Sequence, residues 1–196
     1  MAATVTGLIL SGGSGSRMGG VDKGLQPFRG RSLVEWVIDR LEPQVAEVLI
    51  SANRNLERYL AFGHPVLTDP EGGFAGPLAG LRAGLGQARS ELVMVAPCDS
   101  PLLPADLVRR MVAALEREEA EVAVARTRER AHPIFCLCRV TLVDHLTAFF
   151  EGGGRKVETW YASLRVTEVD FEDQADAFRN VNTLEDLAAL EQQPYR

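Results

Sequence analysis

The sequence predicts an α/β protein of three layers, in which a doubly wound, mostly parallel sheet lies between helices on both of its faces. Three observations lead to this prediction. Short runs of β-branched and aliphatic residues alternate with longer stretches of helical spacing, several of the short runs are apolar almost throughout, and the connections are short. In such sheets ligands bind beyond the carboxyl ends of the strands.

The first 126 residues contain five apolar runs and four stretches with helical spacing. We expect the strands at 5–10, 47–52, 65–68, 91–96 and 120–125. We expect the helices at 32–41, 55–62, 77–88 and 104–118. Pro104 would then stand in the first turn of its helix, a position that proline favours. The alternating order is the basis for predicting the doubly wound sheet.

The pattern changes after residue 126. We expect strands at 133–139 and 165–170, and helices at 141–150, 155–161 and 183–192. The chain contains no internal repeat, low-complexity tract or linker rich in proline, glycine and serine. We therefore expect one domain over residues 1–196, whose second half adds a smaller substrate-binding portion.

The composition and charge of the chain argue against several classes of protein. The 196 residues are 46% hydrophobic and 24% charged, which is enough apolar material for a full core. The chain lacks both the roughly 18 consecutive apolar residues that cross a bilayer and the pattern of a signal peptide, so we expect a cytoplasmic protein that does not bind membranes. Three cysteines, an odd number, favour reduced thiols. The net charge of −6, without a basic run, argues against nucleic-acid binding.

The first 31 residues differ in charge from the rest. Arg17, Lys23, Arg29 and Arg31 outweigh Asp22 to give a local charge of +3, so the remaining residues carry −9. A small anion would be attracted to this region. Only two of the 21 basic residues are lysines, at positions 23 and 156. A lysine in such a chain can mark a site for a compact ammonium group, although chance explains two lysines as well.

The glycine-rich segment LILSGGSGSRMGGVDK predicts a phosphate-binding loop. A strand leads directly into Gly12, Gly13 and Gly15, and the segment ends with the cations Arg17 and Lys23. Glycines let backbone amides approach a phosphate closely, and the cations add full charges. The positions fit neither the dinucleotide fingerprint nor the P-loop signature, so a Rossmann dehydrogenase and a P-loop NTPase are not supported. The structural alternative is a flexible turn.

An aspartate at the end of an apolar strand predicts a metal site. Asp99 closely follows the apolar run 93–97, on the sheet edge to which the glycine-rich loop also belongs. A carboxylate there could hold Mg²⁺ against a triphosphate, whereas the alternative is a cap for the turn or helix that follows. We expect Cys98 to be a packed neighbour rather than a nucleophile, because no histidine is near in sequence. We expect Cys136 and Cys138 to be core thiols rather than metal ligands.

Further polar residues stand at expected strand ends. Asn53 and Asp69 have the side chains suited to reading a base edge or ribose hydroxyls, because an amide donates and accepts while a carboxylate accepts from paired N–H groups. Turn formation explains both almost as well. In the second half of the chain, His132 precedes a proline and is a further candidate.

Two other segments of the second half are candidate sites. Three glycines followed by Arg155 and Lys156 at a helix start are typical of an anion site, and a solvated turn is the alternative. Asn180 and Asn182 precede the last expected helix. Asn182 is explained more simply as the N-cap of that helix, with Glu185 completing a capping box.

These motifs together resemble the MobA family of molybdenum cofactor guanylyltransferases, which are nucleotidyltransferases with a Rossmann-like, nucleotide-diphospho-sugar-transferase-like sheet. The resemblance covers nearly the whole chain, in order. The segments that carry it are Leu10-Ser11-Gly12-Gly13, Ser16-Arg17-Met18-Gly19-Gly20, Asp22-Lys23, Cys98-Asp99-Ser100-Pro101 and Asn180-Val181-Asn182-Thr183. The chain departs from the family in having serine at position 11, where alanine is common, and at position 100, where threonine is common.

The resemblance implies an enzyme that transfers GMP from GTP to the terminal phosphate of Mo-molybdopterin, forms molybdopterin guanine dinucleotide and releases pyrophosphate with Mg²⁺ present. It implies a nucleotide-binding half over residues 1–126, a molybdopterin-binding half over 127–196, and molybdoenzyme chaperones or other cofactor-biosynthesis proteins as further partners. The expected GTP-binding residues are Leu10, Ser11, Gly12, Gly13, Gly15, Lys23, Asn53, Asp69 and Asp99. The expected catalytic residues are Arg17, Lys23 and Asp99, with Asp99 as the metal ligand. The expected molybdopterin-binding residues are His132, Arg155, Lys156, Asn180 and Asn182.

The chemistry fits these residues, because a phosphate nucleophile is already anionic and needs no side-chain base. Three alternative functions can each be compared with this one by a feature of the sequence. The sister cytidylyltransferases typically begin with Leu-Ala-Ala-Gly, where this chain has Gly12-Gly13. Sugar-phosphate nucleotidyltransferases usually have longer chains. A nucleotide-binding adaptor without turnover would have little need for Lys23 and Asp99 together.

Overall fold

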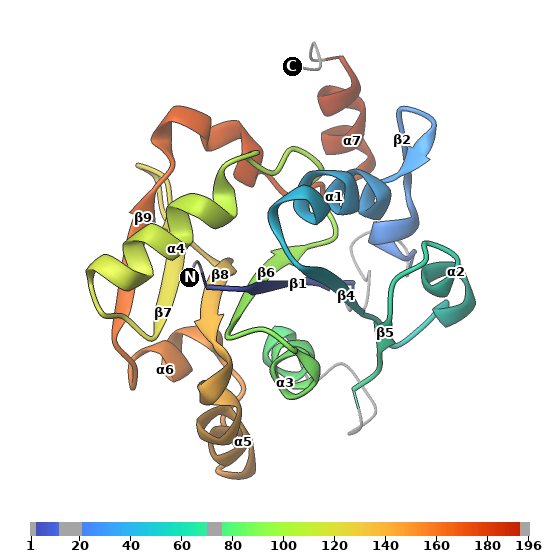
Figure 1. Ribbon diagram of the computed structural model, residues 1–196. Coiled ribbons are helices and arrows are strands. Elements are labelled where there is room, and N and C mark those ends of the chain that lie inside the picture. The colour runs from blue at the N-terminus through green and yellow to red at the C-terminus, as the bar shows by residue number, and fades with distance from the viewer. Residues whose placement is uncertain (1–2, 12–20, 70–75, 193–196) are drawn as a thin grey trace.

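The computed structural model describes residues 3–11, 21–69 and 76–192. Seven strands form one sheet in the order β5-β4-β1-β6-β8-β7-β9 (Figure 1). All neighbouring strands are parallel except at β8, which runs antiparallel to both β6 and β7. The predicted mostly parallel sheet is therefore confirmed. The strands are β1 (Val5–Leu10), β4 (Glu47–Ser51), β5 (Val66–Leu67), β6 (Leu92–Pro97), β7 (Val122–Arg126), β8 (Ala131–Arg139) and β9 (Val166–Asp170).

Helices cover both faces of this sheet, as the sequence predicts (Figure 1). Helices α1 (Leu33–Leu41) and α4 (Leu107–Arg117) bury their apolar sides on one face. Helices α3 (Pro77–Gln87), α5 (Val143–Glu151) and α6 (Val157–Tyr161) do so on the other. Two separate apolar layers result, one on each side of the strands. The shorter helix α2 (Leu56–Leu60) follows β4 and precedes β5.

Helix α3 packs closely on the sheet through glycines that face it. A Cβ atom added at Gly84 would lie 2.3 Å from a methyl carbon of Leu8, and one added at Gly80 would lie 2.7 Å from Ser51 Oγ. Real Cβ contacts are not this short, so larger residues would push the helix outward. The lack of a Cβ atom at Gly80 and Gly84 thus sets the spacing between this helix and strands β1 and β4.

The start of helix α4 corrects a sequence prediction. The helix begins at Leu107, three residues after the expected Pro104. The side chain of Gln44, in a 3-10 helix (Glu42–Gln44), donates to the Pro104 carbonyl and accepts from the Val108 amide at 2.9 and 3.0 Å. This distant side chain satisfies groups at the helix start that local sequence leaves open.

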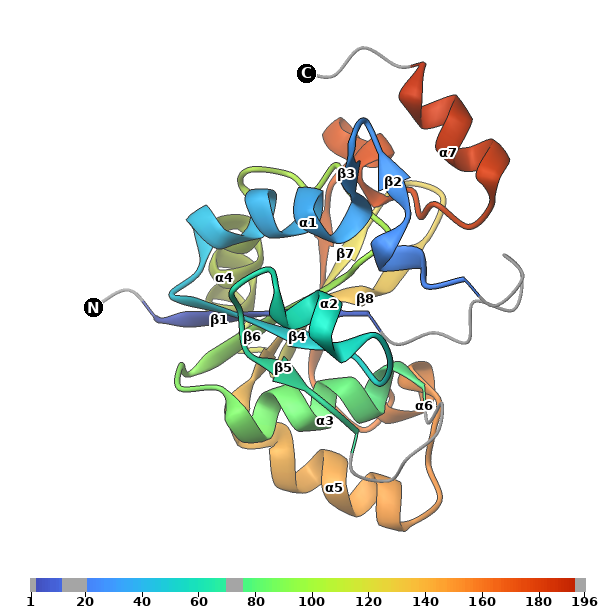
Figure 2. The ribbon, with the colours of Figure 1, turned by 90° about the vertical axis from the view of Figure 1, so that its right-hand side faces the viewer.

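A small hairpin and the last helix pack together, an arrangement that the sequence did not predict. Strands β2 (Pro27–Phe28) and β3 (Arg31–Ser32) form the hairpin beside α7 (Leu184–Glu191), as Figure 2 shows. Buried residues from the two regions form one cluster: Phe28, Leu33, Val181, Leu187 and Leu190. The Arg29 guanidinium donates to the carbonyls of Leu190 and Glu191, both at 3.2 Å. The segment before α7 is thereby held near the first third of the chain.

One edge of the sheet gathers the ends of most strands. Strands β1, β4, β5, β6, β7 and β9 all end there, and the reversed strand β8 begins there. This carboxyl edge is where ligands bind in open α/β sheets. In the described ranges, no helix has both the length and the apolar character that spanning a bilayer requires.

Candidate active site at the carboxyl edge of the sheet

Lys23 lies at the centre of the candidate site. The 3-10 helix η2 (Lys23–Leu25) presents its ammonium to Asp99, which follows β6, and to Asn182, which precedes α7. Lys23 Nζ lies 3.4 Å from Asp99 Oδ2 and donates to Asn182 Oδ1 at 2.7 Å. The lysine side chain is 23% exposed and that of Asp99 is 10% exposed. Solvent or a ligand can therefore reach the ammonium, while the carboxylate is mostly enclosed.

The second carboxylate oxygen of Asp99 has properties expected of a metal ligand. Asp99 Oδ1 is buried and has no hydrogen-bond partner among the described residues. Burial raises the pKa of Asp99 above its ordinary value, and the nearby Lys23 ammonium opposes that effect. A hard divalent cation would satisfy this oxygen. Because no group of three His, Cys, Asp or Glu side chains gathers at any point of the described chain, such a cation would take further ligands from phosphate and water.

The segment before α7 holds Asn182 in place. The N-cap of α7 is Thr183, whose hydroxyl accepts from the Asp186 amide at 3.0 Å. The Asp186 carboxylate accepts from the amides of Asn182 and Thr183. These bonds hold the pKa of Asp186 below its ordinary value. The expectation that Asn182 itself caps the helix with Glu185 is therefore wrong by one residue, and the Asn182 side chain points to Lys23 instead.

Asn180 joins the same region through Ser100. The Ser100 hydroxyl donates to Asn180 Oδ1 at 3.2 Å, and the Val181 amide donates to the Asp99 carbonyl at 2.9 Å. The segment Asn180-Val181-Asn182 thus runs alongside Asp99-Ser100. Two segments that the sequence singled out independently are in direct contact.

The expected nucleotide-binding residues of the described chain stand at neighbouring strand ends. Leu10 ends β1, and the Ser11 amide donates to the Ser51 carbonyl at the end of β4. The Asp69 amide donates to Asn53 Oδ1 at 2.8 Å, which joins the segments that follow β5 and β4. The four residues occupy the carboxyl edge, as expected. Gly12, Gly13, Gly15 and Arg17 lie outside the described residues.

His132 occupies a small hollow of its own. It is 9% exposed, and its Nε2 lies 3.0 Å from the Thr127 hydroxyl. Its ring stacks on Phe178 with centroids 5.1 Å apart. Burial, and then the charge of Arg130, lower the pKa of His132. The hollow measures about 110 Å³ and is also lined by Arg179. A neutral imidazole beside arginine side chains is suited to hydrogen bonding rather than to a permanent charge.

Arg155 and Lys156 differ in their surroundings although both are exposed. Arg155 donates to the carbonyls of Phe150 and Gly154 at 2.9 and 2.7 Å and lies over the Phe150 ring. Lys156 stands at the N-cap of α6. Helices α6 and α7 lie on opposite sides of the sheet, so this pair and Asn182 belong to different flanks of the edge (Figure 2).

The sequence alone indicates no separate role for Asp22. Its carboxylate is 7% exposed and accepts from the Tyr59 hydroxyl and from Asn55, both in or next to α2. Its position directly before Lys23 is a sequence feature that could mark it as part of the site. Nothing in the neighbouring sequence indicates that α2 holds it. The expected roles of the cysteines as packed thiols agree with the structure, since Cys98, Cys136 and Cys138 are all buried and free.

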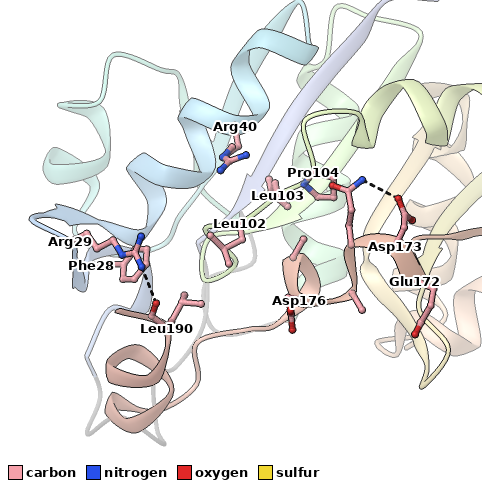
Figure 3. Close-up of a pocket in the computed structure, with 13 residues that line it drawn as sticks. Phe28, Arg29, Arg40, Leu102, Leu103, Pro104, Glu172, Asp173, Asp176 and Leu190 are labelled. Atoms are coloured by element: carbon pink, nitrogen blue, oxygen red, sulfur yellow. Dashed lines mark hydrogen bonds between the residues drawn. The ribbon is translucent and has the colours of Figure 1, made fainter. Parts of the chain in front are cut away.

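A larger hollow, of about 670 Å³, opens on the side of the hairpin and α7 (Figure 3). Its walls carry charged residues that have partners there, for example Arg29 on the Leu190 carbonyl and Asp173 on Gln174. Neither Lys23, Asp99 nor Asn182 lines it. It is therefore separate from the candidate site.

Comparison with known proteins gives consistent matches. A family described as the MobA-like NTP transferase domain matches residues 7–167. The molybdenum cofactor guanylyltransferase of Cupriavidus taiwanensis is 54% identical over 192 residues, which covers 95% of this chain and 96% of that protein. The crystal structure of molybdopterin-guanine dinucleotide biosynthesis protein A from Archaeoglobus fulgidus has a TM-score of 0.79 at 20% identity, covering 95% of this chain and 97% of that one. A Mycobacterium tuberculosis protein solved in complex with manganese has a TM-score of 0.72 at 19% identity, covering 98% and 100%.

Proposed function

Because the chain belongs to the family of MobA-like NTP transferases, we propose that it transfers GMP from GTP to the terminal phosphate of Mo-molybdopterin and releases pyrophosphate. One observation carries this proposal at the level of residues. The ammonium of Lys23 and the enclosed carboxylate of Asp99 meet at the carboxyl edge of the sheet, 3.4 Å apart. A cation and a candidate metal ligand at that edge suit a nucleoside triphosphate.

The chain's own residues act by positioning and by electrostatics. The attacking group is a phosphate, which is already anionic, so no side chain has to remove a proton from it. Lys23 places a positive charge where charge develops on the phosphates, and Asn182 orients that ammonium. Asp99 would hold a divalent cation, for which we propose Mg²⁺, and the bound ion would supply further neutralisation of phosphate charge.

The remaining expected residues complete the proposed nucleotide site. Leu10, Ser11, Gly12, Gly13 and Gly15 would bring backbone amides to the phosphates, and Arg17 would add a second cation. Asn53 and Asp69 would contact the base or the ribose, which is supported by their position at neighbouring strand ends. Residues 1–126 would thus form the GTP-binding half.

Residues 127–196 would bind the second substrate. Asn182 stands beside Lys23 and Asn180 stands beside Ser100, and both would meet the terminal phosphate of molybdopterin. Arg155 and Lys156 would contact more distant parts of it, on the other side of the edge. His132, which stacks on Phe178, would contact it on the same side as Asn180. We place the reaction in the cytoplasm, where the three free, buried thiols would stay reduced.

The experiment compares nucleotides on the purified protein. With Mg²⁺ present, GTP at 100 times its dissociation constant should stabilise the fold by about 2.7 kcal/mol, and CTP should do so much less. Pyrophosphate should then appear only when GTP and molybdopterin are both added. Stabilisation by CTP alone would favour a cytidylyltransferase, and binding of GTP without pyrophosphate release would favour an adaptor.

A further inference from the structure

The carboxylate of Asp22 is enclosed by polar partners from another part of the chain. Its Oδ1 accepts from the Tyr59 hydroxyl at 2.6 Å, and its Oδ2 accepts from Asn55 Nδ2 at 2.9 Å. Arg54 Nε lies 3.8 Å from Oδ2. Tyr59 is fully buried, and burial together with the Asp22 carboxylate raises the pKa of its hydroxyl. The hydroxyl therefore remains a donor to Asp22.

The backbone on both sides of Asp22 is held as well. The Val21 carbonyl accepts from Arg54 Nη2 at 3.1 Å, and the Asp22 carbonyl accepts from the Leu25 amide and from Gln26 Nε2. A Cβ added at Gly24 would lie 2.6 Å from the Tyr59 hydroxyl and 3.1 Å from Cys98 Sγ. The turn that carries Lys23 therefore fits tightly against Tyr59 and against Cys98, directly after β6.

The start of α2 has an uncommon backbone conformation at this contact. Asn55 is in the left-handed region, with φ of 52°, which is uncommon outside glycine but tolerated by asparagine. This conformation occurs at the residue that donates to Asp22. The segment 54–59 therefore contributes three side chains to the binding of one carboxylate.

Asp22 and Lys23 are neighbours in sequence but have different partners. The ion pair of Lys23 is with Asp99, whereas that of Asp22 is with Arg54. The aspartate thus faces α2 while the lysine faces the site. Because the two residues are adjacent, fixing the Asp22 side chain also fixes the backbone from which the Lys23 side chain extends.

We propose that Asp22 is a positioning residue, whose carboxylate, held by Tyr59 and Asn55, sets the place of the Lys23 ammonium opposite Asp99 and Asn182. This inference rests on the proposed function, because Lys23 has to act on the phosphates for its position to matter. A displacement of about 1 Å at a reacting group can cost about 10²-fold in rate. Asp22→Asn should cause such a displacement, because an amide has one acceptor oxygen where the carboxylate has two and lacks the negative charge that faces Arg54.

The test is a double-mutant cycle with Asp22→Asn and Lys23→Ala, with pyrophosphate release followed in the presence of GTP, Mg²⁺ and molybdopterin. If Asp22 acts through Lys23, Asp22→Asn lowers kcat about 10²-fold in the natural protein and has almost no effect in the Lys23→Ala background. An equal loss in both backgrounds would overturn the inference. Full activity of Lys23→Ala would instead overturn the proposed role of the lysine, so the two failures are distinguishable.

Matched variants separate positioning from loss of stability. Tyr59→Phe and Thr6→Val each remove a buried hydroxyl that donates to a carboxylate, since Thr6 donates to Glu47 at 2.9 Å near the opposite end of β1. Both should lower the melting temperature, but only Tyr59→Phe should lower kcat. An equal loss of kcat in Thr6→Val would contradict the inference. If Asp22→Asn does not fold, Asn55→Gly keeps the left-handed backbone, removes one donor to Asp22, and should lower kcat with little change in the KM for GTP.

Discussion

The amide oxygen of Asn182 lies 2.7 Å from the ammonium nitrogen of Lys23, although 159 residues separate them in the chain. The contact joins the first half of the molecule, which carries the expected nucleotide-binding residues, to the second half. Asp99 stands beside the same ammonium, at the end of the strand that lies between the two halves. A reaction between two phosphorylated substrates needs such a meeting point, because both must approach the same charges.

We expect Lys23→Ala and Asp99→Asn each to lower the rate of GMP transfer by about 10² to 10³-fold, because each removes a charge placed for the phosphates or their cation. Circular dichroism should show that both variants remain folded. Asp106→Asn is the matched control, since it also disturbs a carboxylate with hydrogen-bond and ion-pair partners but lies at the start of α4. Rates near that of the natural protein in both site variants would refute the assignment.

The pH dependence of stability should reveal the enclosed state of Asp99. Its pKa is raised in the folded protein, so protonation favours folding below the ordinary value near 3.8, and this contribution disappears as the pH rises through the raised pKa. Without divalent cations, the unfolding free energy of the natural protein relative to Asp99→Asn should therefore fall as the pH rises. Urea unfolding at a series of pH values measures this difference.

Asp173→Asn is a control for this measurement, because the contribution of Asp173 to the unfolding free energy should change with pH in the opposite direction. Arg110 binds the Asp173 carboxylate through two hydrogen bonds and holds its pKa below the ordinary value. The contribution of Asp173 is therefore present above its ordinary pKa and is lost as the pH falls through the lowered one. If both differences changed in the same direction with pH, the interpretation of Asp99 would be wrong.

Two glycines of helix α3 should respond oppositely to the same substitution. Gly84→Ala would bring a methyl group within 2.3 Å of Leu8 and should destabilise the fold by about 1–3 kcal/mol. Gly86 has open space around its Cβ position, so Gly86→Ala should stabilise it by about 0.4–1 kcal/mol. Chemical denaturation of the two variants tests the close packing of α3, and equal effects would contradict it.

Arg155 and Lys156, the neighbouring cations at the start of α6, should differ in how their removal affects the melting temperature. We expect Lys156→Ala to raise the KM for molybdopterin about tenfold, the loss of roughly 1.4 kcal/mol of binding, and to leave the melting temperature unchanged. Arg155→Ala should raise the same KM and also lower the melting temperature, because its guanidinium holds the Phe150 and Gly154 carbonyls and lies over an aromatic ring. An unchanged KM in both variants would remove these residues from the second-substrate site.

Local patterns were sufficient where one segment determines its own structure. Strand β1 has the predicted bounds, 5–10, because its apolar run is bounded and buried on both faces. Helix α1 begins one residue after Ser32, whose side chain and Glu35 form a capping box. In both cases, the residues that set the limits of the element lie inside it or directly next to it.

Distant side chains decided the features that the sequence did not predict. Gln44 sets the start of α4, and Tyr59 holds Asp22 from 37 residues away. The hairpin strands β2 and β3 have two residues each, too few for any alternating pattern to be visible. The sequence predicts the site as residues at strand ends, but the contact between Asn182 and Lys23 follows only from the whole fold.

The reversed direction of β8 brings an additional connection between strands to the carboxyl edge of the sheet. Because β8 starts at the edge where β7 ends, the turn at 127–130 lies at the carboxyl edge of the sheet. The segment at 171–182 lies at the same edge, because β9 runs parallel to β7. Substitutions or insertions in those two stretches alter what approaches from the second half and leave β1, β4 and β6 untouched. These two stretches can therefore vary in length and sequence without disturbing the strands that carry Leu10, Asn53 and Asp99 at their ends.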